Sequence, residues 1–359
     1  MSGLLYHSDW IKARERLTTW WNGGDIGRPA IQLTTGNPNP VEAIHSMTEP
    51  EGWQTYYSTK SLPYRVHCAL YGPSEALYFG EACPSGSPGD LAPNTLALYL
   101  GCKGREMPGT VWCEPCIESL ETARFEYDPD NFYWKFSQDA FRQVAEKGKG
   151  KMLLQFPDLI EGLDTLAAMR GTQILLQDLI ERPEWVHESL KKITQLYFHY
   201  YDMLYDIIRD DVGGSVYWVW APGRLTKLQC DFSAMISPGM FKEFMVPVLT
   251  EMTERVSYSM YHWDGPDAVC HLDALLSIPH LDMIQWVPGD GASPSHSKEW
   301  WPLYHRILDS GKKLFIFINN SDHLLTFKKE FGPKMKGMLL NMPCSTPGKA
   351  KEILKSAEF

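Results

Sequence analysis

The residues best suited to chemistry follow two short apolar runs in the C-terminal half of the chain. The run at 258–261 leads into His262 and Asp264, and the run at 281–287 contains Gln285. Side chains alternate along a strand, so His262 and Asp264 would project from the same side of an extended segment. An imidazole and a carboxylate at this spacing can bind a metal together, or can act as a hydrogen-bonded acid–base couple without one.

Cys344 is a third residue that a metal could use. It lies 80 residues after Asp264, just past a predicted strand at 337–341. A nitrogen, oxygen and sulfur ligand set with an open fourth position is typical of catalytic zinc, and these ligands favour Zn²⁺ or Co²⁺ over Mg²⁺. A single cysteine after a strand is also explained as a small buried apolar residue. The spacing leaves both interpretations open.

Alternating helices and strands would position these residues. The apolar patterns predict strands at 28–33, 76–79, 109–112, 152–156, 215–220, 258–261, 283–287, 313–318 and 337–341. They predict helices at 10–21, 139–147, 163–170, 174–180, 183–208, 238–254, 268–278, 300–310, 324–331 and 347–357. This alternation predicts an α/β protein, a (β/α)₈ TIM-type barrel. A doubly wound sheet is the alternative, although no Gly-x-Gly-x-x-Gly follows any strand.

The segment 36–130 departs from this alternation and is rich in Pro and Gly. We interpret it as an irregular elaboration packed against the barrel, within a single domain spanning 1–359. Active sites of such barrels lie at the carboxyl ends of the strands. The residues expected at that face are Asp158, Trp220, Asp231, His262, Asp264, Gln285, Asn319, Asn320, Asn341 and Cys344.

The composition of the 359 residues narrows the class of protein. A net charge of −10 with dispersed acids and bases argues against nucleic acid or a membrane surface as a partner. We find no signal peptide and no 18-residue apolar run, so we expect a cytoplasmic protein. The eight scattered cysteines indicate reduced thiols. Cys113-Glu-Pro-Cys116 matches Cys-x-x-Cys without a second pair, which indicates chance spacing.

Longer segments of the chain resemble the uroporphyrinogen decarboxylase-like superfamily, which includes zinc-dependent corrinoid and cobalamin-independent methyltransferases. The segment 230–247, CDFSAMISPGMFKEFMVP, is similar to the family's Asp…Ser-Pro-x-x-Phe-x-x-Phe…Pro pattern. Arg28-Pro-Ala-Ile is similar to its early Arg-Pro strand, and 163–171 to its Leu-x-Gly helix region. The segment 76–81, ALYFGE, is similar to its strand with a substrate-contacting acid, which implies that role for Glu81. The family fold is a (β/α)₈ barrel.

The methyltransferase branch binds zinc through His-x-Cys on one strand and a distant Cys. The resemblance therefore implies His262, Asp264 and Cys344 as metal ligands, with a carboxylate replacing one thiolate. This exchange makes zinc a stronger Lewis acid, better suited to activating water, a hydroxyl or a carbonyl than a soft thiolate. The decarboxylase branch holds acidic pyrroles with arginines. Arg28 is present, but the early arginine-rich motif is absent, so we do not predict haem biosynthesis.

The leading hypothesis is a zinc-dependent methyltransferase acting between a corrinoid on a partner protein and a thiol, folate or other small nucleophile. The expected catalytic residues are Asp231, Asp264 and Glu81. The expected substrate-binding residues are Arg28, Trp220, Tyr261, Gln285, Trp286 and Asn320. One alternative is a metal-assisted or metal-free lyase, decarboxylase or hydrolase of a small oxygenated substrate, with Asp264 or Asp231 as base. A catalytically silent binding protein is another, and the sequence leaves a homodimer open.

Overall fold

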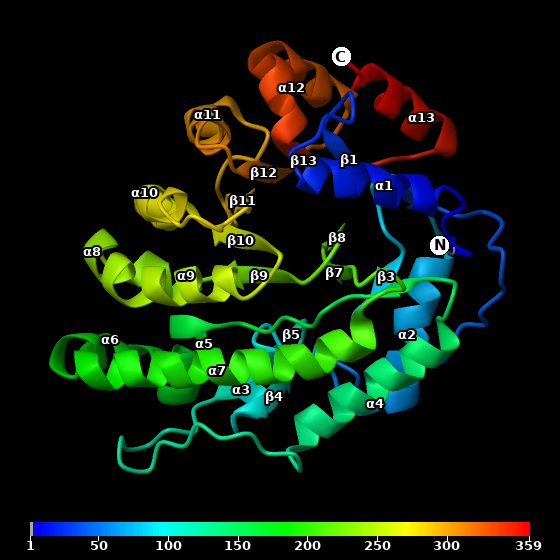
Figure 1. The fold of residues 1–359 in the computed structure, drawn as a ribbon. Helices are drawn as coiled ribbons and strands as arrows, with labels where there is room; N and C mark the ends of the chain where they lie inside the picture. The colour runs from blue at the N-terminus through cyan, green and yellow to red at the C-terminus, as the bar shows by residue number, and fades with distance from the viewer. Residues whose placement is uncertain (1–2) are drawn as a thin grey trace.

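A computed structural model describes residues 3–359 as a mixed α/β fold in which helices surround the strands (Figure 1). The main sheet has seven strands in the order β2-β1-β13-β12-β11-β10-β9. β1, β13, β12, β11, β10 and β9 are neighbours in this order and run parallel, whereas β2 pairs antiparallel with β1. The sheet strands are β1 (Ala30–Gly36), β2 (Ala76–Gly80), β9 (Leu225–Gln229), β10 (Tyr258–Asp264), β11 (Met283–Val287), β12 (Lys313–Phe317) and β13 (Met338–Pro343).

Smaller pairings lie beside this sheet. The strands concerned are β3 (Ser85–Gly86), β4 (Lys103–Met107), β5 (Thr110–Glu114), β6 (Leu153–Leu154), β7 (Ser215–Tyr217) and β8 (Val219–Ala221). β3 pairs parallel with β6, a parallel bridge joins Gln155 to Val216, and β4–β5 and β7–β8 are antiparallel hairpins. Within residues 3–359 the ladders do not run unbroken from β9 round to β2. The α/β class and a mostly parallel central sheet are as predicted, while closure of the barrel stays a prediction.

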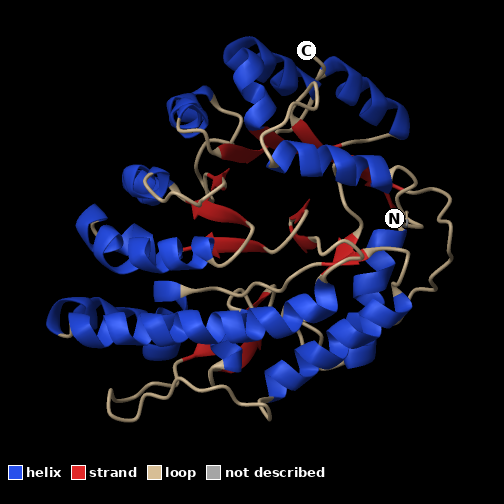
Figure 2. Ribbon diagram, viewed as in Figure 1, coloured by secondary structure: helices blue, strands red, loops and turns tan. Residues whose placement is uncertain are grey.

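The helices cover the outside of the strands (Figure 2). They are α1 (Trp10–Trp21), α2 (Leu62–Ser74), α3 (Thr95–Tyr99), α4 (Phe132–Lys147), α5 (Gly162–Arg170), α6 (Thr172–Glu181), α7 (Pro183–Ile208), α8 (Pro238–Met240), α9 (Val246–Glu254), α10 (Leu272–Leu276), α11 (Trp301–Asp309), α12 (Ser321–Phe331) and α13 (Pro347–Ser356). No helix within residues 3–359 combines the length and apolar character needed to cross a membrane.

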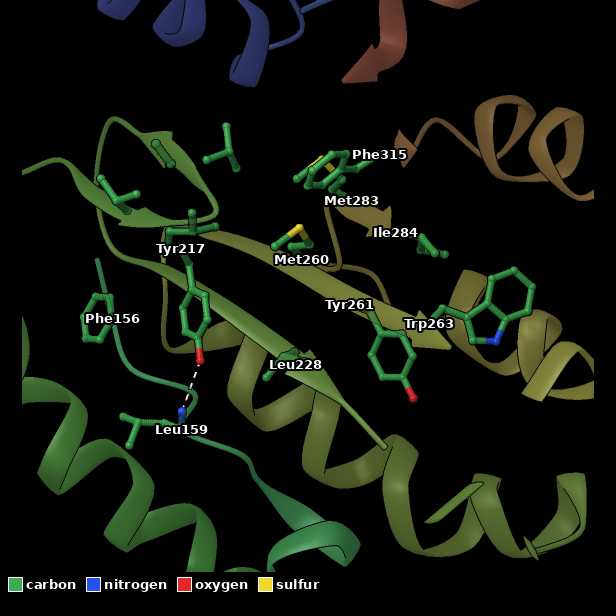
Figure 3. Packing of buried hydrophobic residues seen from close by; sticks show 14 of the residues in the cluster. Phe156, Leu159, Tyr217, Leu228, Met260, Tyr261, Trp263, Met283, Ile284 and Phe315 are labelled. Carbon is green, nitrogen blue, oxygen red and sulfur yellow. Dashed lines mark hydrogen bonds between the residues drawn. The ribbon is translucent and has the colours of Figure 1, made fainter. Parts of the chain in front are cut away.

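Strand alternation explains how the core positions the functional residues. On β10, Tyr261 and Trp263 point toward the surrounding helices, whereas Met260 points to the opposite face with Met283 of β11 (Figure 3). His262 has the same parity along the strand as Met260, so it shares that inner face. All these apolar side chains are almost completely buried. The core thus fixes the strand on which His262 lies.

Sequence patterns predicted most elements but missed β9 and, within the segment 36–130, α2, α3, β3 and β4. The helices at 10–21 and 183–208 and the strand at 283–287 have the predicted bounds. The predicted strand at 215–220 is instead the β7–β8 hairpin. The segment 36–130 contains α2, α3 and β2 to β5, and β2 belongs to the main sheet.

Candidate functional site

Polar side chains line the inner face of β9, β10 and β11. Gln229 of β9 and Gln285 of β11 both lie in register with His262 of β10, so three polar residues form a row across neighbouring strands. Lys227 is two residues before Gln229 and shares its face of β9. Gln229 ends β9, His262 lies in the carboxyl half of β10, and Gln285 is at the middle of β11. Barrels of this class hold their active sites at the carboxyl ends of the strands.

His262 is held in one orientation. Its Nδ1 lies 2.6 Å from Oε1 of Gln285, and the indole ring of Trp218 meets the imidazole edge-to-face at 5.3 Å between centroids. Burial, and secondarily the charge of Lys227, lower the pKa of His262 below its ordinary value. An amide oxygen only accepts, so Nδ1 donates and Nε2 keeps its lone pair. No described residue bonds Nε2. A neutral imidazole with a free Nε2 can act as a base or as a metal ligand.

Lys227 places a buried positive charge beneath this row. Its side chain has 0% exposure and forms an ion pair with Asp158. Nζ also donates to Oε1 of Gln229 and lies 5.2 Å from the centroid of the Trp218 ring. Gln229 Nε2 in turn donates to Oδ2 of Asp231 at 3.2 Å. A connected polar chain therefore runs from Asp158 through Lys227 and Gln229 to Asp231.

Several carboxyl groups around Lys227 are shifted toward their protonated forms. Burial raises the pKa of Glu161 to about 8, and desolvation together with Asp231 raises the pKa of Asp164 to about 7. Desolvation and the charge of Asp158 raise the pKa of Asp90 to about 7, and desolvation also raises the pKa of Asp231. Acids with pKa values near neutrality can give or take protons at physiological pH.

Two of these acids are also tied to the backbone of β9 and the segment after it. Glu161 Oε1 accepts from the backbone N–H of Gln229 at 2.8 Å, while its Oε2 is buried without a hydrogen-bond partner among residues 3–359. Asp164 accepts from the backbone N–H groups of Asp231 and Phe232, both at 2.8 Å. These bonds hold the end of β9 against the start of α5.

A cavity of about 580 Å³ opens beside Asp231. The β4–β5 hairpin forms one wall through Trp112 and Cys113, and α5 forms another through Ala167 and Ala168. Asp164, Gln229 and Asp231 line it as well. The cavity is large enough for a small ligand, and its polar residues connect directly to the row on β9 to β11.

The predicted metal ligands are only partly arranged for a metal. The Oδ1 of Asp264 is buried without a described partner, and desolvation raises the pKa of Asp264. The thiol of Cys344 instead donates to the carbonyl oxygen of Thr346 at 3.2 Å. Among residues 3–359, no three His, Cys, Asp or Glu side chains gather at a common point as a metal ion requires. The residues present therefore do not fit a three-ligand site.

Glu81 and Arg28 lie at the amino ends of the parallel strands, opposite the end at which His262 lies. Glu81 is fully buried and accepts from Arg28 and from Nε of Arg16, each at 2.7 Å, and from the backbone N–H of Ile31 at 2.8 Å. Ile31 is near the amino end of β1, whereas His262 is in the carboxyl half of β10. Burial raises the pKa of Glu81, but hydrogen bonds and charges from the arginines outweigh it and the net shift is downward. The structure does not bring Glu81 or Arg28 to the other predicted residues.

The predicted aromatic wall also lies elsewhere. Tyr261 and Trp286 have the opposite strand parity from His262 and Gln285 and are buried under the helices. Trp220 is buried as well, and its Nε1 donates to Asp210 at 2.9 Å. Asn320 caps α12 by accepting from the N–H groups of Asp322 and His323.

The aromatic residue that does contact His262 is Trp218, which sequence reasoning missed, together with Lys227, Gln229, Glu161 and Asp164. A signal existed for two of them, because Leu225-Thr-Lys-Leu-Gln229 places Lys227 and Gln229 at alternate positions on either side of Leu228. Such a pattern is typical of a strand with polar groups on one face. For Trp218 the signal was absent, because a tryptophan within an apolar run is usually a core residue.

Comparisons with known proteins show the fold. No protein-family model matches the chain, and no curated protein matches it in sequence. Among solved structures, a methyltransferase from Methanosarcina mazei is similar, with a TM-score of 0.59 over 96% of this chain and 97% of that chain. The two are 11% identical in sequence, so the likeness extends to the fold alone.

Proposed function

We propose that this chain is a methyltransferase that moves a methyl group from a methylated donor to a small nucleophile. The observation behind the proposal is the neutral imidazole of His262, fixed by Gln285 with Nε2 free. Such a group is suited to activating a nucleophile. Among reactions that need an activated nucleophile, methyl transfer is favoured by the full-length likeness in fold to a methyltransferase.

In the proposed reaction, the acceptor gives its proton to Nε2 of His262 as its lone pair forms a bond to the methyl carbon. The bond from that carbon to the donor breaks, and the donor keeps the electron pair. Gln285 holds the imidazole in the required tautomer, and Asp231 and Gln229 orient the substrate from the cavity wall. Trp218 excludes water from one side of the imidazole.

Zinc and a corrinoid-bearing partner protein are the finer part of this proposal. Nε2 of His262 and Oδ1 of Asp264 have no hydrogen-bond partner among the described residues, so both atoms are open to a metal ion. Two observations speak against zinc held by His262, Asp264 and Cys344. The thiol of Cys344 is hydrogen-bonded to Thr346, and no three ligand side chains gather at one point within residues 3–359. Metal analysis of the purified protein by inductively coupled plasma mass spectrometry, repeated on Cys344→Ala, tests this part. About one zinc per chain that is lost in Cys344→Ala would support it.

The test of methyl transfer uses the purified full chain with methylcobalamin as donor and a panel of small thiols as acceptors. Methylated product is measured by mass spectrometry. His262→Ala should lower the rate by about 10²–10⁴-fold, the usual contribution of a general base. His280→Ala, the same change at an exposed histidine, should leave the rate unchanged. Added imidazole should restore part of the activity of His262→Ala.

The pH profile gives an independent check on His262. Because burial lowers its pKa, the imidazole stays neutral below the ordinary value of about 6.5. Activity should hold at neutral pH and fall only at more acidic pH, as His262 becomes protonated. Methyl transfer from methylcobalamin that is absent with every acceptor of the panel, or that His262→Ala does not affect, would overturn the proposal.

A lyase or decarboxylase is the second candidate, and the protonated acids favour it. Glu161 and Asp164 have pKa values of about 8 and 7, so both can supply a proton to a carbanion left after bond cleavage. The discriminating measurement is release of carbon dioxide from small carboxylates in the absence of any methyl donor. Turnover under those conditions would support the lyase and would contradict the methyltransferase.

A further inference from the structure

Two cysteine thiols lie in contact outside the site described above. The Sγ atoms of Cys102 and Cys116 are 3.7 Å apart, and both cysteines are free. The β4–β5 hairpin explains the contact, because Lys103 pairs with Glu114 at its open end. Cys102 directly precedes Lys103, and Cys116 follows Glu114 by two residues. The hairpin register thus brings two residues 14 apart in sequence to the same point.

The two thiols differ in environment. Cys102 is 1% exposed and its Sγ also lies 3.5 Å from the carbonyl oxygen of Ala168. Cys116 is exposed and lines a second cavity, of about 450 Å³. The hydrogen bond from Cys102 lowers the pKa of Cys116 below its ordinary value, and the same contact and burial raise the pKa of Cys102. Cys116 is therefore the accessible, more acidic thiol, and Cys102 is its shielded neighbour.

We propose that Cys102 and Cys116 form a reversible disulfide when a hydroperoxide oxidises Cys116. The thiolate of Cys116 attacks the terminal peroxide oxygen, and the O–O bond breaks to give a sulfenic acid and water or an alcohol. The thiol of Cys102 then attacks the sulfenic sulfur, an S–S bond forms, and water leaves with the thiol proton. Two thiols are oxidised and one peroxide is reduced. A dithiol reverses the step by thiol–disulfide exchange.

This pairing differs from the one that Cys-x-x-Cys spacing suggests. Cys113 lies on β5 and pairs with Gly104 of β4, and its Sγ lies 3.8 Å from the carbonyl oxygen of Asn94. It lines the cavity beside Asp231, here called the main cavity, and does not line the second one. The contact to Cys116 is made by Cys102. Cys113 is thus the alternative disulfide partner of Cys116 that the experiment must distinguish from Cys102.

The disulfide would tie together segments that border the main cavity. Pro115 lines that cavity, and the N–H groups of Cys116 and Ile117 both donate to the carbonyl oxygen of Met169 on α5, each at 2.9 Å. Oxidation would fix this segment to the start of β4 and raise the melting temperature, because a cross-link restricts the unfolded chain. The inference stands apart from the proposed function, since its readout is the disulfide itself.

The experiment treats the reduced full chain with hydrogen peroxide, alkylates the remaining thiols and maps disulfides in tryptic peptides by mass spectrometry. Cleavage after Lys103 and Arg105 separates Cys102 from Cys116. We expect a cross-link between the peptides 66–103 and 106–124 that dithiothreitol removes. The cross-link should be lost in Cys102→Ser and in Cys116→Ser, and kept in Cys113→Ser and in the matched control Cys68→Ser.

The order of reaction is tested with a dione probe for sulfenic acids. Cys102→Ser should accumulate a labelled Cys116, whereas Cys116→Ser should leave Cys102 unlabelled because Cys102 is buried. Cys116 is exposed, so Cys116→Ser keeps the test valid even if the buried substitution impairs folding. A cross-link lost in Cys113→Ser, or peroxide treatment that leaves Cys102 and Cys116 as free thiols, would overturn the proposal.

Discussion

A single lysine balances the acids of the candidate site. Lys227 has no exposed surface, and its positive charge lowers the pKa values of Asp90, Glu161, Asp164 and Asp231 against the upward effect of desolvation. Lys227→Met should reduce the free energy of unfolding by about 3 kcal/mol at pH 7.5, because it leaves Asp158 without its partner. Urea denaturation measures the loss.

Two comparisons separate the charge of Lys227 from its volume. Lys227→Met combined with Asp158→Asn should recover part of the lost stability, since the unpaired carboxylate is removed as well. The loss of stability should be smaller at pH 5.5, because Asp90, Glu161 and Asp164 are then protonated and no longer interact with the charge of Lys227. Lys191→Met, at an exposed position of α7, should change stability little. Equal losses at both pH values would mean that packing, rather than charge, explains the role of Lys227.

At the scale of elements, the β7–β8 hairpin determines where Trp218 lies. Trp218 is the turn residue and has a φ of 59°, a left-handed conformation that costs a non-glycine residue about 1–2 kcal/mol. Its N–H donates to Gln155 and its carbonyl oxygen accepts from Gln32, so the backbone is fixed on both sides. The hairpin holds this strained conformation and presents the indole to His262.

Two substitutions at Trp218 separate backbone strain from ring packing. Trp218→Ala loses the ring but keeps the strained backbone, whereas Trp218→Gly loses the ring and adopts positive φ freely. Trp218→Gly should therefore be more stable than Trp218→Ala by about 1 kcal/mol, measured by urea denaturation. Both should weaken the proposed activity equally, because both expose His262. If Trp218→Ala is the more stable variant, the turn is not strained.

The spacing of apolar residues explains which helices and strands the sequence could predict. The helix at 183–208 and the strand at 283–287 were predictable because their apolar residues repeat at helical or strand spacing. Parity also places Tyr261 and Trp286 on the face opposite His262 and Gln285, so their predicted role as a wall conflicted with the strand assignment itself.

Other features needed long-range pairing that no local pattern contains. Leu225–Gln229 was missed because Lys227 and Gln229 weaken its apolar pattern, yet all five residues are buried in the structure. The contact between Glu81 and Ile31 depends on the antiparallel pairing of β2 with β1. Local spacing equally gives no distance between Cys344 and Asp264, because Cys344 follows β13 and Asp264 ends β10, two strands that β11 and β12 separate.

At the scale of the whole molecule, Glu161 links stability to pH. Its pKa is about 8 in the folded chain, raised by burial, against about 4.3 when unfolded. Folding therefore binds a proton. The stabilisation from the protonated carboxyl is complete below about pH 4 and is lost as pH rises toward 8. At about 1.4 kcal/mol per pKa unit, the ionisation of Glu161 alone should lower the free energy of unfolding by about 3–4 kcal/mol between pH 5 and pH 8.5.

Glu161→Gln removes this titration but keeps an oxygen that can accept from the N–H of Gln229. Because the amide stays neutral, the variant should be more stable than the natural chain at pH 8.5 and equal or less stable at pH 5. The free energy of unfolding in urea of the variant, relative to that of the natural chain, should therefore rise as the pH increases from 5 to 8.5. Glu188→Gln, at an exposed position of α7, should follow the natural curve throughout. A Glu161→Gln curve parallel to the natural one would mean that Glu161 is ionised in the folded chain, and Lys227 would then be its counter-charge rather than that of Asp158 alone.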